Sequence, residues 1–266
     1  MEPKLFFQAD MPQGEVLPIA GGTAGVFSAP SPDRQTPNED AAALVRVNGH
    51  AAVLVVADGL GGSPAGEQAS ALAIREMIAS LKEAPAEEPT LRAAILDGIE
   101  AANRAVSELG IGAATTLAVA EIQGRTVRPY HVGDSMILVV GQRGKIKLQT
   151  ICHSPVGYAV EAGLLDEDEA MNHQERHVVS NIIGTPDMRI DVGSTVEMAR
   201  YDTLLLATDG LFDNLHLDEI VERVRKGPLK RVVRRLADDC RRRMEAPEPG
   251  WPSKPDDLTF VTFRSG

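Results

Sequence analysis

Residues 51–67 read AAVLVVADGLGGSPAGE, an apolar run that ends at Asp58 and passes into a glycine-rich turn. A run that is apolar at every position is typical of a strand covered on both faces. Asp58 is therefore expected where a buried strand reaches the surface. A carboxylate there costs free energy unless it is hydrogen-bonded, neutralised or bound to a cation. Asp-Gly is also a common turn, so this stretch alone leaves a plain turn and a cation site open.

A second apolar run, residues 41–47, precedes the first and is joined to it by Asn48-Gly49-His50. Asn-Gly between two apolar runs predicts a β-hairpin. In such a hairpin Asp40, at the start of one strand, lies beside Asp58, at the end of the other. Two carboxylates at one end of a hairpin favour a bound cation.

The composition indicates a globular protein of one large domain or two small ones. The chain has 266 residues, 43% of them apolar, and a formal net charge of −11. Residues 223–243 hold ten lysines and arginines against two aspartates, so the rest of the chain is more acidic still. Such an acidic body argues against nucleic-acid binding. We interpret the basic residues of 229–243 as the solvated face of a helix rather than as a docking surface.

Cellular location is predicted from three observations. No apolar run approaches the roughly 18–20 residues that a membrane span needs. The first ten residues lack the charged and apolar regions of a signal peptide,. Cys152 and Cys240 are the only cysteines, which suits a reducing compartment and excludes a disulfide framework,. We therefore expect a cytoplasmic protein without membrane contact.

Hydrophobic periodicity divides the remainder of the chain. Residues 1–22 are rich in Pro and Gly and predict a loosely attached lead-in, followed by one domain over 23–266,. Short turns between the strands of 114–150 predict an antiparallel meander. Residues 152–192 are less regular and predict a flap, with a short helix near 166–171. Strands are expected at 23–29, 41–47, 51–57, 114–122, 126–132, 136–140, 145–150, 195–198, 203–207 and 258–264, and helices at 67–82, 90–109, 217–225 and 229–243.

This order of elements predicts an α+β fold in which antiparallel sheets pack together with helices outside. Further acids lie at or just beyond the ends of apolar strands: Asp134, Asp209, Asp213 and Asp256. Several acids at comparable junctions predict that the strand ends converge on one mouth. Clustered carboxylates repel one another unless cations intervene. Because the sequence has no His-x-His pair and no cysteine cluster, the ligands would be oxygens, which suit Mg²⁺ or Mn²⁺.

Five motifs follow one another in order. They are Asn38-Glu39-Asp40, Asp58-Gly59-Leu60-Gly61-Gly62 with Gly66-Glu67, Gly133-Asp134-Ser135, Thr208-Asp209-Gly210, and Asp256-Asp257-Leu258-Thr259. Their order and spacing resemble the metal-dependent Ser/Thr protein phosphatases of the protein phosphatase 2C type, above all the small bacterial members, over residues 23–264. The resemblance implies a four-layer α-β-β-α sandwich. It also implies hydrolysis of phosphoserine and phosphothreonine in proteins by a metal-activated water, which reverses a Ser/Thr kinase.

The same resemblance implies a centre of two Mn²⁺ or Mg²⁺ ions. Asp58 would bridge the two metals and the carbonyl of Gly59 would bind one of them. Asp209 and Asp256 would complete the other.

Four more positions match the family's motifs. Glu39 and Asp40 would hold water molecules around the metals. Asp134 and Asp213 correspond to positions that hold a third, weaker metal.

The chain departs from the family at three points. The family's phosphate-binding arginine usually lies four residues before the matching glutamate, where this chain has Gln35 and Arg34 lies one residue further away. A one-residue bulge at Pro37 would restore its aim, so we predict Arg34 as the phosphate ligand and a catalytic residue. Leu60 stands where some members carry a proposed acid histidine, so no leaving-group acid is identified. His153 is interpreted as structural.

Two alternatives remain open at this stage. The chain is either an enzyme or a catalytically weak regulatory module that keeps the same fold. An active centre would also suit a small phosphate ester, because the metals recognise phosphate rather than protein. For the enzyme we expect phosphoprotein substrates, a cognate Ser/Thr kinase pathway and a monomer.

Overall fold

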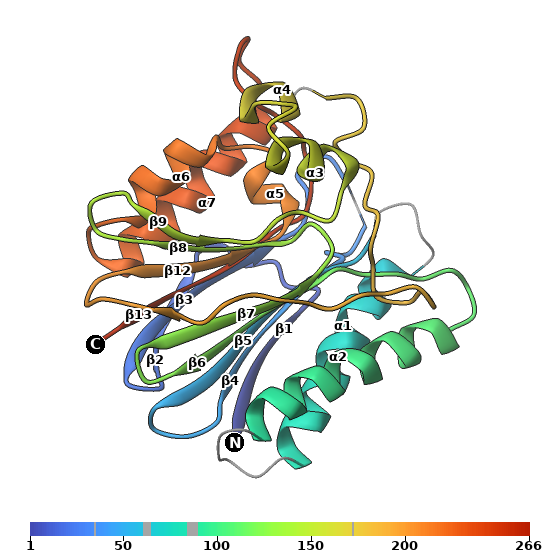
Figure 1. The fold of residues 1–266 in the computed structure, drawn as a ribbon. Coiled ribbons are helices and arrows are strands. Elements are labelled where there is room, and N and C mark those ends of the chain that lie inside the picture. The colour runs from blue at the N-terminus through green and yellow to red at the C-terminus, as the bar shows by residue number, and fades with distance from the viewer. Residues whose placement is uncertain (35, 61–64, 84–89, 172) are drawn as a thin grey trace.

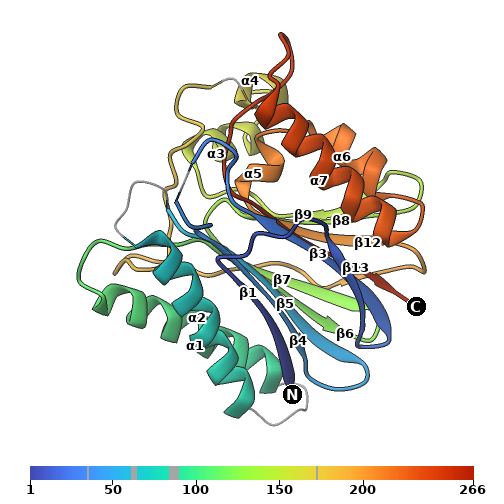
Figure 2. The ribbon, with the colours of Figure 1, turned by 180° about the vertical axis from the view of Figure 1, so that it is seen from behind.

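The structure is a computed structural model that describes residues 1–34, 36–60, 65–83, 90–171 and 173–266. Two antiparallel sheets pack face to face, and helices cover the outer face of each (Figures 1 and 2). This arrangement confirms the predicted α+β class with its four layers. Within the described ranges, no helix is both long enough and apolar enough to span a membrane.

The first sheet contains the predicted hairpin, formed by the strands β4 and β5. Its strand order is β1-β4-β5-β6-β7-β10, with β11 also paired to β7. The strands are β1 (Glu2–Phe7), β4 (Asp40–Arg46), β5 (Ala51–Asp58), β6 (Leu117–Gln123), β7 (Thr126–Val132), β10 (Asp191–Val192) and β11 (Val196–Glu197). Its outer face is covered by α1 (Gly66–Glu83) and α2 (Thr90–Glu108).

The second sheet has the order β2-β3-β13-β12-β8-β9. Its strands are β2 (Glu15–Ile19), β3 (Gly22–Ala29), β8 (Met136–Val140), β9 (Ile146–Gln149), β12 (Thr203–Ala207) and β13 (Leu258–Ser265). The helices on its outer side are α6 (Leu217–Val224) and α7 (Leu229–Glu245). Three shorter helices, α3 (Pro155–Glu161), α4 (Glu167–Met171) and α5 (Asp209–Phe212), lie together at one end of the sandwich (Figure 1).

Strand β5 shows why the stretch 51–57 is apolar throughout. Successive side chains of a strand point to opposite faces. Leu54 and Val56 belong to the core between the two sheets, whereas Val53 and Val55 belong to the core beneath α1 and α2. The strand is therefore buried on both sides and reaches solvent only at its end, where Asp58 is partly exposed.

The predicted lead-in over 1–22 is wrong. Strand β1 pairs with β4, and β2 pairs with β3, so this segment adds an edge strand to each sheet. Edge strands tolerate proline because one side of the backbone needs no ladder partner, and β1 and β2 contain Pro3 and Pro18,. The prolines that indicated a loose segment are thus compatible with its place in the fold.

The predicted meander over 114–150 is wrong at one joint. Strands β6 and β7 are antiparallel neighbours, but the chain then crosses to the other sheet, where β8 pairs with β12 and β9. The crossing occurs at Gly133-Asp134-Ser135. Gly133 has a φ of +109°, and a Cβ there would lie 2.6 Å from the Thr116 side chain, so the corner requires glycine,. Asp134 is therefore held at the junction of the two sheets.

Candidate active site

The two hairpin carboxylates meet as the sequence predicts. Asp40 and Asp58 are direct partners in the β4–β5 register. Asp58 is fixed by Thr116, whose Oγ1 accepts from the Asp58 amide at 3.0 Å and whose amide donates to the Asp58 carbonyl at 2.8 Å. Asp40 is 1% exposed, and its Oδ2 accepts from Thr208 Oγ1 at 2.9 Å. Its Oδ1 has no hydrogen-bond partner among the described residues.

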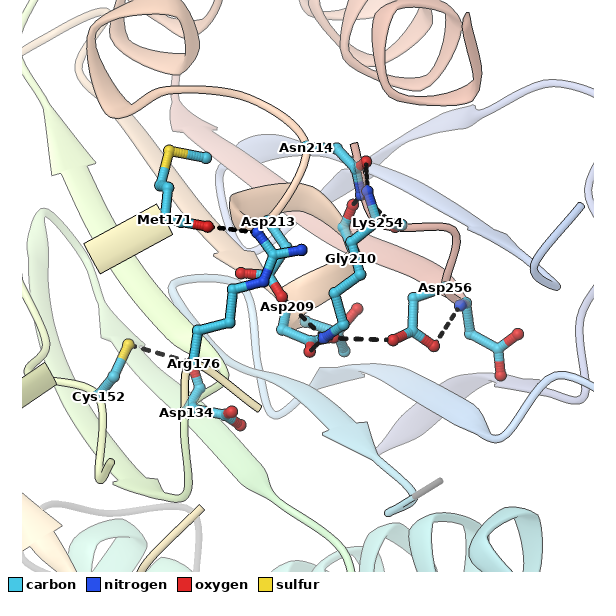
Figure 3. Close-up of polar contacts among 12 residues, drawn as sticks. Asp134, Cys152, Met171, Arg176, Asp209, Gly210, Asp213, Asn214, Lys254 and Asp256 are labelled. Carbon is cyan, nitrogen blue, oxygen red and sulfur yellow. Dashed lines mark hydrogen bonds and ion pairs between the residues drawn. The ribbon is translucent and has the colours of Figure 1, made fainter. Parts of the chain in front are cut away.

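The other strand-end acids come to the same mouth. Asp209 begins α5 directly after β12, and Asp213 is the C-cap of that helix. Asp256 precedes β13, the neighbour of β12, and Asp134 lies at the sheet crossing. Figure 3 shows these four carboxylates gathered in one region. The structure thus brings every predicted strand-end acid to one end of the sandwich.

The carboxylates of the mouth lie close enough together to disfavour one another's ionisation. Desolvation raises the pKa of Asp58 well above its usual range, and Asp40 and Asp209 raise it further. Desolvation and the charge of Asp209 raise the pKa of Asp134 to about 7, and the same two causes raise the pKa of Asp256 to about 6. A site that binds a cation brings several carboxylates together. Without the cation these carboxylates repel one another, and their pKa values rise.

The loop before β4 is held against this mouth by Asp257. Its carboxylate accepts from the amide of Ser31 at 2.7 Å and from the amide of Glu39 at 2.6 Å. As a result, Arg34 Nη1 lies 3.6 Å from Asp256 Oδ1 and 3.9 Å from Glu39 Oε2. Burial, followed by the charge of Asp257, raises the pKa of Glu39, and Arg34 partly offsets this. The guanidinium therefore reaches the site, whereas the neighbouring Gln35 lies outside the described residues.

Gly59 and Gly66 allow the backbone to pack closely behind Asp58. The amide of Gly59 donates to the Glu39 carbonyl at 3.2 Å. A Cβ at Gly59 would lie 2.3 Å from the Gly66 carbonyl oxygen, and one at Gly66 would lie 2.8 Å from Glu39 Oε1. These glycines are needed for close approach of three segments. The adjacent Gly61 and Gly62 lie outside the described residues.

Two residues of the site were missed by the sequence analysis. Asp257 belongs to the motif Asp256-Asp257-Leu258-Thr259, but nothing in that motif indicates its role as an acceptor for the loop amides. Lys254, from the Pro-rich segment 246–255, places its Nζ 2.5 Å from Asp209 Oδ2 and 2.7 Å from Asp213 Oδ2 (Figure 3). A single lysine in an irregular segment has no periodicity, so no pattern pointed to it.

His153 is structural, as interpreted from the sequence, and it ties the flap to the corner that carries Asp134. Its amide donates to the Gly133 carbonyl at 3.0 Å, and its Nδ1 accepts from the Gly133 amide at 3.1 Å and from Asn181 Nδ2 at 2.8 Å. His131 and Asp191 lie close enough to share a metal with it. However, the accepting Nδ1 leaves the proton on Nε2, the nitrogen that faces Asp191, so His153 has no free lone pair for a metal,.

A cavity of about 370 Å³ opens beside the carboxylates, between the flap and α5. Its wall is mostly apolar, and it also includes Arg176 from the flap and three of the acids. The lining includes Met136, Ile151, Val156, Met171, Phe212 and Leu215 together with Asp134, Asp209 and Asp213. The charged mouth and the apolar cavity therefore form one continuous site.

Comparisons with known proteins agree with this geometry. The family model for protein phosphatase 2C matches residues 32–246. The serine/threonine phosphatase stp of Listeria monocytogenes serovar 1/2a is 30% identical over 210 residues, which cover 76% of this chain and 81% of that protein. The Streptococcus agalactiae serine/threonine phosphatase structure superposes with a TM-score of 0.78 at 27% identity, covering 91% of this chain and 99% of its own.

A further solved structure, the catalytic domain of the serine threonine protein phosphatase PstP in complex with two manganese ions, has a TM-score of 0.70 at 24% identity. It covers 91% of this chain and 96% of its own length, and it supports the fold. Because the family model matches most of the chain, the chain belongs to the protein phosphatase 2C family of metal-dependent serine/threonine protein phosphatases.

Proposed function

We propose that this phosphatase holds two divalent cations, Mn²⁺ or Mg²⁺, through Asp58, the carbonyl of Gly59, Asp209 and Asp256. The convergence of these strand-end carboxylates is the observation that carries the proposal. The donors fit such ions because they are hard oxygens with unmet charge. The related PstP structure contains two manganese ions, which supports the number. When bound, such cations lower the pKa of a coordinated water and neutralise developing charge on phosphate.

The remaining acids are assigned supporting roles. Asp40 has an Oδ1 without a hydrogen-bond partner among the described residues. The Glu39 carboxylate lies near Asp256, because both acids pair with the guanidinium of Arg34. We assign to Asp40 and Glu39 the orientation of water around the cations. Asp134 and Asp213 flank Asp209 and are assigned to a third, weaker cation position, because all three interact electrostatically.

Arg34 is assigned to the substrate phosphate. Its side chain is 42% exposed, so the guanidinium lies at the rim, where an incoming phosphate arrives. A guanidinium can donate two parallel hydrogen bonds to phosphate oxygens and so orient the group for attack. Its ion pairs with Asp256 and Glu39 hold it beside the carboxylates while the site is empty of substrate.

The substrate is a phosphoprotein, and the cavity beside the carboxylates suits a peptide better than a small phosphate ester. A small ester would need only the charged mouth. An apolar cavity continuous with that mouth offers a place for a side chain next to the phosphorylated residue,. We further propose a monomer that acts in a Ser/Thr kinase pathway in the cytoplasm. The cysteines Cys152 and Cys240 are unpaired, which supports a reducing compartment,.

Hydrolysis of a phosphothreonine peptide, with and without Mn²⁺, tests these assignments. Asp209→Asn should lower kcat/KM by roughly 100-fold or more, because it removes charge from the cation site. Arg34→Ala should lower kcat/KM by roughly tenfold, mainly through KM, since it removes one charge-assisted phosphate contact. Asp238→Asn, on the exposed face of α7, is the matched control and should behave like wild type.

Three outcomes would contradict parts of the proposal. If wild type and Asp209→Asn are equally inactive with Mn²⁺, the regulatory-module alternative is correct. If p-nitrophenyl phosphate is hydrolysed with a higher kcat/KM than the peptide, the small-ester alternative is favoured. If Arg34→Ala leaves KM unchanged, Arg34 is not the phosphate ligand.

A further inference from the structure

A lysine side chain lies inside the carboxylate cluster of the site. Lys254 Nζ is 2.5 Å from Asp209 Oδ2, 2.7 Å from Asp213 Oδ2 and 3.4 Å from Asp256 Oδ2 (Figure 3). The side chain is only 22% exposed. Its ammonium group therefore lies among three oxygens of the kind that would bind a divalent cation.

The backbone of Lys254 is held in place by a buried residue of the same site. Asn214 is fully buried, its Oδ1 accepts from the Lys254 amide at 2.8 Å, and its Nδ2 donates to the Lys254 carbonyl at 2.8 Å. The same Nδ2 donates to the Gly210 carbonyl at 2.9 Å, within α5. Because α5 also carries Asp209, the lysine is anchored to the element whose acids it contacts.

The ammonium group is charged in this environment. Its Nζ donates to two carboxylates, at 2.5 Å to Asp209 Oδ2 and 2.7 Å to Asp213 Oδ2, and such charge-assisted hydrogen bonds favour the protonated lysine,. The lysine thus neutralises part of the negative charge that a metal would otherwise neutralise.

We propose that Lys254 is an internal counter-ion that competes with a divalent cation for the position between Asp209, Asp213 and Asp256. This inference rests on the proposed cation site. Cation binding at this position is then an exchange, in which the metal enters as the ammonium group leaves. The exchange breaks two charge-assisted hydrogen bonds, and the displaced ammonium remains tethered nearby, where it repels the metal. Lys254 therefore weakens cation binding at this position and stabilises the cation-free protein.

Mn²⁺ binding to the full chain tests the proposal without reference to catalysis. The electron paramagnetic resonance signal of free Mn²⁺, measured during titration, gives the number of bound ions and their dissociation constants. Lys254→Met keeps an unbranched stem of similar bulk but removes the charge. It should tighten at least one Mn²⁺ site by roughly ten- to a hundredfold, the equivalent of one or two charge-assisted hydrogen bonds.

The matched control is Lys147→Met. Lys147 also forms a close, partly buried ion pair, at 2.5 Å from Asp202 Oδ2, but it lies on β9 outside the carboxylate cluster. This variant should bind Mn²⁺ like wild type. A second readout is thermal unfolding. In EDTA, Lys254→Met should unfold at a lower temperature than wild type. Saturating Mn²⁺ should raise the melting temperature of Lys254→Met by more than it raises that of wild type.

The outcomes separate this inference from the proposed function. If wild type binds Mn²⁺ and Lys254→Met binds it equally or more weakly, the counter-ion role is wrong and the cation site stands. If neither protein binds Mn²⁺, the proposed cation site itself fails. Should Lys254→Met not fold, Lys254→Gln keeps a polar group without charge, and the same tightening is expected of it.

Discussion

Replacing Asp134 with asparagine should stabilise the cation-free protein at pH 8 and change its stability little below about pH 4. Burial and the charge of Asp209 raise the pKa of Asp134 from its ordinary 3.8 to about 7 in the folded protein. The folded state then binds this proton more tightly than the unfolded state does. The penalty on folding is therefore absent below the unfolded-state pKa, grows as the pH rises between the two pKa values, and is complete above the folded-state pKa.

The magnitude follows from the two pKa values. Between pH 5 and pH 8 they correspond to a loss of about 2.5 kcal/mol in the unfolding free energy of wild type, which Asp134→Asn does not suffer. His131 and His153 have lowered pKa values, so they make both proteins more stable as the pH rises through this range. The histidine contributions therefore cancel in the difference between the two proteins, which reports the ionisation of Asp134 together with its electrostatic coupling to Asp58. Urea unfolding in EDTA, followed by far-ultraviolet circular dichroism, measures it.

The control is Asp187→Asn, at an exposed position, which should follow the wild-type pH profile. If the unfolding free energies of wild type and Asp134→Asn depend on pH in the same way, the reasoning is refuted. Asp134 would then have the same pKa in the folded and the unfolded protein. Saturating Mn²⁺ should remove most of the variant's advantage at pH 8, since a bound cation compensates the carboxylate that the variant lacks.

Two further substitutions test the close packing behind the cluster and the loop that leads into it. Gly59→Ala places a Cβ 2.3 Å from the Gly66 carbonyl oxygen and should destabilise the protein by about 1–3 kcal/mol or more in urea unfolding; a change below 0.5 kcal/mol would contradict the packing argument,. Asp257→Ala removes the acceptor for two amides of the loop 31–39 and should cost about 2–3 kcal/mol,. It should also lower kcat/KM toward a phosphopeptide, because Arg34 loses its support; unchanged kcat/KM would show that the loop is held by other contacts.

The central hairpin could be predicted because its determinants are local. Asn48-Gly49 specifies the turn, and two apolar runs of equal length specify the register, so Asp40 and Asp58 meet without help from the rest of the chain,. The long amphipathic helices were predictable for the same reason. Their boundaries moved by only a few residues, from 67–82 to Gly66–Glu83 and from 90–109 to Thr90–Glu108.

The features that sequence reasoning missed depend on long-range partners. The connection 133–135 joins β7 in the first sheet to β8 in the second. A three-residue connection of this composition could equally join two neighbouring strands of one sheet, so the sequence does not reveal the crossing. Strand β2 has no strong period because it lies at an edge, half exposed,. Lys254 belongs to the site only because Asn214, 40 residues earlier, anchors its backbone. Such placements are set by tertiary packing rather than by local pattern.

The β4–β5 hairpin places its turn and its paired carboxylates at opposite ends of the same strands. Strand β5 runs eight residues from the exposed turn at His50 to Asp58, and an extended strand of that length spans roughly 25 Å,. The turn is therefore remote from the carboxylates and from the cavity beside them. A fluorophore, a surface tether or a short peptide tag inserted there would leave the mouth facing open solvent. The protein can thus be immobilised or followed as single molecules through this turn while large phosphoprotein substrates still reach the other end.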